Sequence, residues 1–365
     1  MKDQNAQKML ARVMNWDEAQ VMAQIDNLQL MASQKYDSYQ QFSPGKKFIE
    51  SLALWLTQFD QEDRENAFSL VSKELIYISD QELSHLVETA YPDHIVQERL
   101  RIVAEETGFK PHEIGVIRNH QRFRELSLKT LYLGLSDGAR TNQLRRASKN
   151  EISNEQIWQA YELGEVKARD MVGELASALD LPEDEAEKAR FNLVWLIDDF
   201  SGSGNTYIRY DQKKQKYKGK ITKIYERLNR GDLVDVSHYE VYLLLLVATR
   251  QAIDHIEYWS ERFTSENRYK PLRLQVLSVI EPEYKVNGDQ SYSELLDNDK
   301  YYDSRAHDKH TEIGGTTDVK RGFAGCSLPV VLSHNTPNNS IYLFWGPETF
   351  DVQGLFPRVT RHKEF

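Results

Sequence analysis

The chain has 365 residues, 40% hydrophobic and 28% charged, a composition typical of a soluble globular protein of about two domains. Its net charge of −10 argues against a general nucleic-acid-binding protein, because phosphate backbones require a basic surface. Cys326 is the only cysteine, which excludes an intrachain disulfide and a cysteine-rich zinc site.

The first part of the chain, residues 1–125, has the pattern of a helical N-terminal region. One apolar face at helical spacing comprises Phe48, Leu52, Trp55, Leu56 and Phe59. Asp60 suits the start of the next helix, and residues 79–82 (Ser-Asp-Gln-Glu) have the form of a capping box that starts another. Pro92 follows soon afterwards and is expected to limit the length of that helix.

The second part, residues 126–365, alternates strands with helices, which predicts an α/β fold with a parallel sheet. Buried strands are expected at residues 128–135, 191–197, 239–247 and 272–280, with helices at 154–179 and 250–263. Residues 284–326 are polar and predict loops with one short helix. Two closing strands are expected at 328–332 and 340–345, on either side of a turn at 335–339.

Two acids and a glycine-containing loop follow the second of these strands. Asp198 and Asp199 stand at its carboxyl end, where ligands bind in parallel sheets. The loop that follows contains Gly202, Ser203, Gly204, Asn205 and Thr206. Its glycines permit close approach of the backbone to an anion, and a helix starting here would favour a phosphate further. Carboxylates accept hydrogen bonds from ribose hydroxyls, so one segment can hold both a phosphate and its ribose.

This segment resembles the type I phosphoribosyltransferase motif: a hydrophobic strand, two acids, three small or apolar residues, and Ser/Thr-Gly-x-Thr. The resemblance implies that Asp198 and Asp199 hold the ribose diol of phosphoribosyl pyrophosphate (PRPP). It also implies that residues 203–206 hold the 5′-phosphate, and that Mg2+ binds with the diphosphate. The chemistry is then transfer at the anomeric carbon, or phosphorolysis of a nucleotide. Asn205 replaces a glycine that many members have, and asparagine tolerates left-handed backbone.

A second loop follows the first strand, where the same family has its pyrophosphate loop. It comprises Ser136, Asp137, Gly138, Ala139 and Arg140. Gly138 permits close backbone approach, and Arg140 is expected to contact diphosphate oxygens and stabilise the leaving group.

The chain is similar, more narrowly, to a phosphoribosyltransferase-like group found in bacterial conflict systems, including proteins encoded beside retrons. The shared features are residues 55–59 (Trp-Leu-Thr-Gln-Phe), the two loops, and residues 334–339, 345 and 356–358 near the C-terminus. The resemblance implies an anti-phage effector directed at nucleotides, with a protein or nucleoprotein partner from a defence operon. The polar first residues and the absence of a long apolar run predict a cytoplasmic protein without a membrane segment.

Several alternatives remain open. The same loops fit a non-catalytic nucleotide sensor. Residues 134–138 (Gly-Leu-Ser-Asp-Gly) also match the elbow of a Ser-His-Asp hydrolase, with His334 or His362 as the base. Residues 202–206 lack the lysine of a Walker loop, and Tyr207 stands where a dinucleotide fingerprint has its third glycine.

Other charged groups have less specific interpretations. Residues 209–230 contain nine Lys or Arg and two acids, and form either a solvated face or a phosphate or nucleic-acid contact beside the site. His307, Asp308 and His310 make a weak metal signal without a fourth ligand. Arg358, Arg361 and His362 form a basic C-terminal tail of undecided role.

Overall fold

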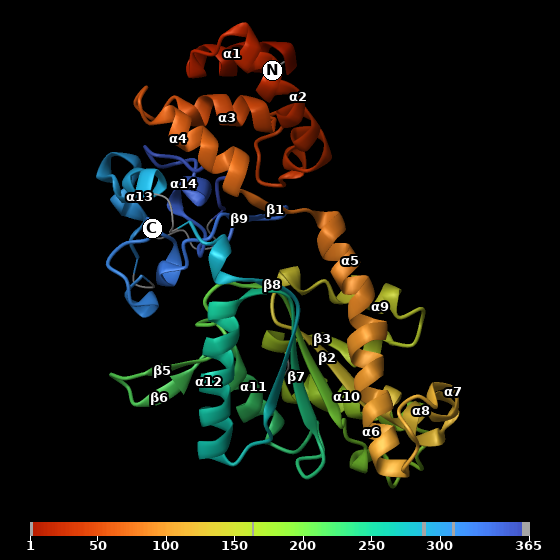
Figure 1. Cartoon of the computed structure of the whole chain (residues 1–365). Coiled ribbons are helices and arrows are strands. Elements are labelled where there is room, and N and C mark those ends of the chain that lie inside the picture. Colours follow the sequence, from red (N-terminus) through yellow and green to blue (C-terminus); the bar gives the residue numbers. More distant parts are fainter. Residues whose placement is uncertain (1–2, 163, 287–289, 309–310, 360–365) are drawn as a thin grey trace. The chain divides into compact units, whose positions relative to one another are not determined.

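The structure is a computed structural model that describes residues 3–162, 164–286, 290–308 and 311–359 (Figure 1). The chain divides into two compact units. The sheet unit comprises residues 83–280, and the terminal unit combines residues 1–82 with residues 281–365. The sequence suggests a different division, into residues 1–125 and 126–365, and that domain boundary stays a prediction.

The sheet unit is built on a five-stranded parallel sheet in the order β3-β2-β4-β7-β8. The strands are β2 (Thr130–Gly134), β3 (Ile157–Gln159), β4 (Leu193–Ser201), β7 (Glu240–Thr249) and β8 (Leu272–Ile280). A separate antiparallel hairpin consists of β5 (Arg209–Asp211) and β6 (Lys216–Lys218). The parallel α/β fold and its four long strands are therefore confirmed.

Helices cover the sheet because its strands are apolar on both faces (Figure 1). Leu133, Leu196 and Leu243 point to one face and share a core with α10, α11 and α12. On the other face Trp195 stacks on Tyr242, with ring centroids 4.2 Å apart. The helices of this unit are α6 (Val96–Thr107), α7 (Ile114–Asn119), α8 (Gln121–Leu128), α9 (Thr141–Ala147), α10 (Glu165–Ala178), α11 (Lys220–Leu228) and α12 (Arg250–Asn267).

The long helix expected at residues 154–179 is wrong before Glu165. Ser153 and Gln156 cap each other around a single 3-10 turn, and residues 157–159 then pair with β2 as strand β3. Helix α10 begins only at Glu165. Pairing with a neighbouring strand outweighs local helix propensity at this short segment.

The predicted capping box before α5 (Asp80–Ala90) is present. The Ser79 amide donates to Glu82 Oε2 at 2.8 Å, and the Glu82 amide donates to Ser79 Oγ at 3.2 Å. Helix α5 ends at Ala90, two residues before Pro92, as expected, but the backbone stays helical. Pro92 lies in a π-helix, Tyr91–Ile95, which leads directly into α6. Single π turns and prolines are common causes of irregularity inside a helical path.

The terminal unit joins the two ends of the sequence around one core. Phe356 stacks on Phe42 and Phe48, with both centroid distances 5.7 Å, and Trp55 Nε1 donates to the Leu343 carbonyl at 3.0 Å. Its elements are α1 (Asp3–Met14), α2 (Glu18–Gln34), α3 (Phe48–Leu56), α4 (Arg64–Ser69), a π-helix (Leu70–Glu74), β1 (Ile76–Ile78), α13 (Gln290–Asp297), β9 (Val330–Leu332) and α14 (Tyr342–Trp345).

The expected closing strands of the terminal unit are half correct. Residues 330–332 form β9, which pairs in parallel with β1. Residues 342–345 form the short helix α14 instead of a strand, because a brief apolar run fits a buried helical turn equally well. Among the described helices, none combines the length and apolar character needed to cross a bilayer.

Candidate functional site

The two predicted loops lie side by side because β2 and β4 are parallel neighbours. Gly134 pairs with Ile197, and the Leu135 amide donates to the Ile197 carbonyl at 2.9 Å. The first loop, residues 136–140, follows β2, and the second loop, residues 202–206, follows β4. The structure therefore brings together the ligand loops that the sequence predicts, at the carboxyl edge of the sheet.

Asp198 ties these segments together. Ser136 Oγ donates to Asp198 Oδ1, and Oδ2 accepts from the Tyr207 hydroxyl at 2.8 Å and from Lys220 Nζ at 2.9 Å. The side chain is almost fully buried. Ser136 Oγ also accepts from the Gly138 amide at 3.1 Å, so the first loop is fixed through Asp198.

The environment of Asp198 opposes its charge and also compensates it. Burial raises the pKa of Asp198, Lys220 lowers it, Asp199 raises it, and Ser136 lowers it. The direction overall is upward from the ordinary value. Both carboxylate oxygens already serve protein donors, so Asp198 is placed to hold the site together rather than to meet a ligand with both oxygens.

Asp199 lies against the first loop. A Cβ on Gly138 would stand 2.2 Å from Asp199 Oδ2, so any larger residue at that position must displace the Asp199 side chain. The Asp199 side chain is also buried. Asp198 and Asp199 lie inside β4, which continues to Ser201, rather than at the carboxyl end that the sequence suggested. Two adjacent buried acids in one strand are costly unless partners or a ligand compensate them.

The second loop rests on the start of α12. Gly204 has φ +76, and a Cβ there would stand 2.9 Å from His255 Cδ2 and 3.0 Å from the Ala252 carbonyl. Thr249 Oγ1 donates to the Gly202 carbonyl at 2.6 Å and accepts from the Ala252 amide at 3.0 Å. Among the described residues, the amides of 203–206 donate to no backbone carbonyl, which leaves them suited to an anion.

The helix expected directly after the second loop is displaced. The chain makes one turn and then forms the β5–β6 hairpin, and α11 begins only at Lys220. The amide of Lys220 donates to the Thr206 carbonyl at 3.1 Å, and that of Ile221 to the Tyr207 carbonyl at 3.0 Å. These two hydrogen bonds connect the start of α11 directly to the second loop, so the hairpin lies between two segments that are adjacent in space. Gly219, with φ +134, permits this, because a Cβ there would stand 2.2 Å from the Tyr207 carbonyl oxygen.

A cavity of about 700 Å³ opens beside the second loop. Thr206 is exposed at its wall, and segments after β2 and β3 also line it. Its charged lining residues are Arg209, Lys216, Lys218, Lys220, Lys223 and Glu226. Five cations against one acid make this cavity suitable for a phosphorylated ligand.

Three residues of the site were not singled out from the sequence. Tyr207 and Lys220 are the partners of Asp198, and Thr249 holds the second loop. Thr249 carried a detectable signal, since a threonine between an apolar run and a helix suits an N-cap. The contacts of the other two depend on where α11 lies.

The hydrolase alternative gains no geometric support within the sheet unit. The Ser136 hydroxyl meets Asp198 directly, without the intervening imidazole of a triad. His334 lies in the terminal unit, where its carbonyl accepts from Gln41 Nε2 at 2.7 Å. His307 Nδ1 contacts the Thr317 carbonyl at 3.0 Å. His310, Arg361 and His362 lie outside the described residues.

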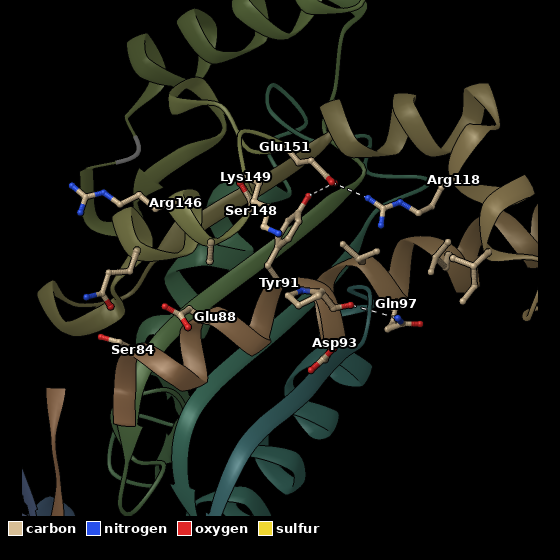
Figure 2. Close-up of a pocket in the computed structure, with 16 residues that line it drawn as sticks. Ser84, Glu88, Tyr91, Asp93, Gln97, Arg118, Arg146, Ser148, Lys149 and Glu151 are labelled. Carbon is tan, nitrogen blue, oxygen red and sulfur yellow. Dashed lines mark hydrogen bonds and ion pairs between the residues drawn. The ribbon is translucent and has the colours of Figure 1, made fainter. Parts of the chain in front are cut away.

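A larger cavity, of about 940 Å³, lies elsewhere in the sheet unit (Figure 2). The π-helix residue Tyr91 donates to Glu151 Oε2 at 2.8 Å, and Arg118 pairs with Glu151 Oε1 at 2.8 Å. Gln143, which also lines it, accepts from Arg140 Nη1 at 3.2 Å. None of the predicted site residues lines this cavity.

Comparison with known proteins agrees with this architecture. No curated protein matches the chain. The model of the PRTase-CE family matches residues 52–358, a span that includes both loops and begins within α3. The chain therefore belongs to the PRTase-CE family of phosphoribosyltransferase-like proteins.

Proposed function

We propose that the protein binds PRPP, or a nucleotide related to it, and transfers its phosphoribosyl group. The observation that carries this proposal is the joining of the two loops through Asp198, which contacts Ser136 of the first loop and Lys220 beside the second. In this proposal the second loop would bind the 5′-phosphate and the first loop the diphosphate. Asp199 lies against the first loop, where it suits the ribose hydroxyls.

Phosphoribosyl transfer requires the protein mainly to position the reacting groups and to offset charge. The bond between the anomeric carbon and the diphosphate oxygen breaks, a bond to the acceptor forms, and diphosphate leaves with the electron pair. An oxocarbenium-like ribose must be held in place while the charge of the leaving group is offset. In this proposal Arg140, the left-handed N-cap residue of α9 (φ +52), would perform the second task.

The donor set is compatible with a magnesium ion carried by the substrate. Within the described residues, no three His, Cys, Asp or Glu side chains gather as a metal site. Both Asp198 oxygens already accept protein hydrogen bonds, which leaves Asp199 as the carboxylate best placed to assist. Mg2+ prefers oxygen ligands, keeps several waters, and would neutralise diphosphate charge when bound.

The biological setting follows from the resemblance to proteins of bacterial conflict systems. In that setting the protein would be a cytoplasmic anti-phage effector that acts on nucleotides beside a protein or nucleoprotein partner. A non-catalytic nucleotide sensor is the second candidate, because the buried and fully bonded Asp198 favours a stable ligand platform as much as it favours turnover.

The test is incubation of the protein with Mg2+, PRPP and pooled nucleobases, nucleotides and NAD, followed by mass spectrometry. The matched variant is Asp199→Asn, which keeps the size of the side chain and removes its charge. Release of diphosphate or loss of a nucleotide with wild type only would support the transferase. Binding of PRPP without turnover would favour the sensor, and absence of both binding and turnover would refute the proposed site.

A further inference from the structure

The positive charge of this acidic chain is concentrated at the hairpin and α11. Residues 209–230 contain nine Lys or Arg against two acids, although the whole chain has a net charge of −10. Both elements border the cavity beside the second loop. Such a local excess in an acidic protein attracts anions to one place rather than to the surface in general.

Strand pairing directs this charge. Tyr210 pairs with Tyr217 across the hairpin, and this face is fixed to α12, with Tyr210 stacked on Trp259 at a centroid distance of 6.0 Å. Because side chains alternate along a strand, Arg209 and its partner Lys218 lie on the opposite face. Both of these cations line the cavity.

Most of the exposed lysines lack a compensating acid. Lys218 pairs with Asp211 at 2.6 Å, and Lys220 pairs with Asp198. In the part of the chain that the structure describes, no carboxylate lies within ion-pair distance of the exposed lysines 213, 214, 216 and 223. Unpaired lysines held together on a rigid hairpin repel one another, and a polyanion would relieve that repulsion.

The basic surface is longer than one nucleotide needs. It starts at Thr206 in the cavity and continues along the hairpin to Lys213 and Lys214, which lie in the turn between β5 and β6. Figure 1 shows the course of the hairpin. At roughly 3.3 Å per strand residue, β5 extends about 7 Å from Arg209 to Asp211, and Lys213 and Lys214 follow it in the turn. A mononucleotide carries its charge at one end, whereas a strand repeats it at every nucleotide.

We infer that the hairpin and α11 bind single-stranded nucleic acid and present it to the phosphoribosyl site. This inference rests on the proposed function, and it makes the substrate that meets PRPP a polynucleotide rather than a free base. A membrane is a poorer partner for this surface, since the face of the hairpin that carries its two tyrosines packs on α12 instead of lying open to lipid.

The test measures binding of fluorescein-labelled 12-nucleotide oligo(dT) and oligo(U) to the full chain by anisotropy, across a range of salt concentrations. The variant is Lys213→Glu/Lys214→Glu, which leaves every residue that lines the cavity in place, and the matched control is Lys8→Glu/Lys73→Glu, which makes the same charge change at exposed lysines elsewhere. We expect the hairpin variant to lose at least about tenfold in affinity and about 1.4 units of salt slope, since each phosphate contact contributes about 0.7. The control should stay within about threefold of wild type.

Other results would overturn the inference. The first is an equal loss of oligonucleotide affinity in both lysine variants, and the second is an unchanged affinity in the hairpin variant. The third is full competition by AMP at matched phosphate concentration. The fourth is lysine-dependent binding of phosphatidylserine vesicles without oligonucleotide binding. PRPP binding, measured by calorimetry, is a separate arm. Both lysine variants should keep it, whereas Asp199→Asn should lose it and keep the oligonucleotide. Failure of PRPP binding in wild type would therefore refute the proposed function, while the oligonucleotide results judge the hairpin.

Discussion

Replacing Lys220 by methionine tests whether the contacts of Asp198 hold the segments of the site together. The substitution keeps the apolar stem of the side chain and removes the ammonium group 2.9 Å from Asp198 Oδ2. Breaking a buried ion pair costs about 3–5 kcal/mol, because it leaves a buried charge without its partner. Lys220 is 31% exposed, so solvent screening reduces our expectation to about 2–3 kcal/mol.

The loss should depend on pH, and its sign follows from the pKa of Asp198. Folding raises this pKa, so the contribution of the group to stability is largest below its unfolded pKa, about 3.9, and falls as pH rises through the folded pKa. Removing Lys220 raises the folded pKa further. The variant should therefore approach wild type as pH falls toward the unfolded pKa, and fall behind as pH rises.

Urea unfolding followed by the fluorescence of tryptophan, including the buried Trp195, measures the difference at each pH. At pH 7 the loss of stability in the Lys220→Met variant should be accompanied by a decrease of roughly 5–10 °C in Tm. The control is Lys220→Met/Asp198→Asn, which removes both charges and should show no pH-dependent difference. A deficit below about 0.5 kcal/mol, or one that is equal at all pH values, would show that the pair is a screened surface contact and would refute this reasoning.

Three further substitutions test the two loops. Gly204→Ala should lower the free energy of unfolding in urea by about 2 kcal/mol or more, because a left-handed alanine would also press on His255. The control Gly315→Ala has the same φ of +76 with nothing within 4 Å, and should cost about 1 kcal/mol. Equal costs would contradict the packing argument. Thr249→Val should lower the free energy of unfolding by about 1–2 kcal/mol and weaken PRPP binding in calorimetry, since it removes both a helix cap and the hydrogen bond to the Gly202 carbonyl. Unchanged affinity would show that the second loop does not need this hydrogen bond. Gly138→Ala should lower PRPP affinity at least about tenfold by displacing Asp199, with a stability change that stays small; a large loss of stability with normal affinity would assign Gly138 to folding alone.

Local patterns were sufficient for four of the five sheet strands. The apolar runs before residues 136 and 198 located β2 and β4, although β4 continues four residues beyond the expected end, and Ser79 with Glu82 identified a real capping box. Each of these signals lies within a few residues of the feature it predicts. Where the pattern was short it failed, as at residues 157–159 and 342–345, because brief apolar runs fit more than one backbone state.

What the sequence determined by itself was therefore the parallel α/β class and two loops suited to phosphate and ribose. Only the tertiary structure decided that β2 and β4 are neighbours, that Lys220 and Tyr207 close around Asp198, and that the first and last segments of the chain share one unit. It also decided that a hairpin separates the second loop from its helix. These contacts join residues far apart in sequence, and they form only when burial of both sheet faces selects one order of strands, which no local pattern encodes.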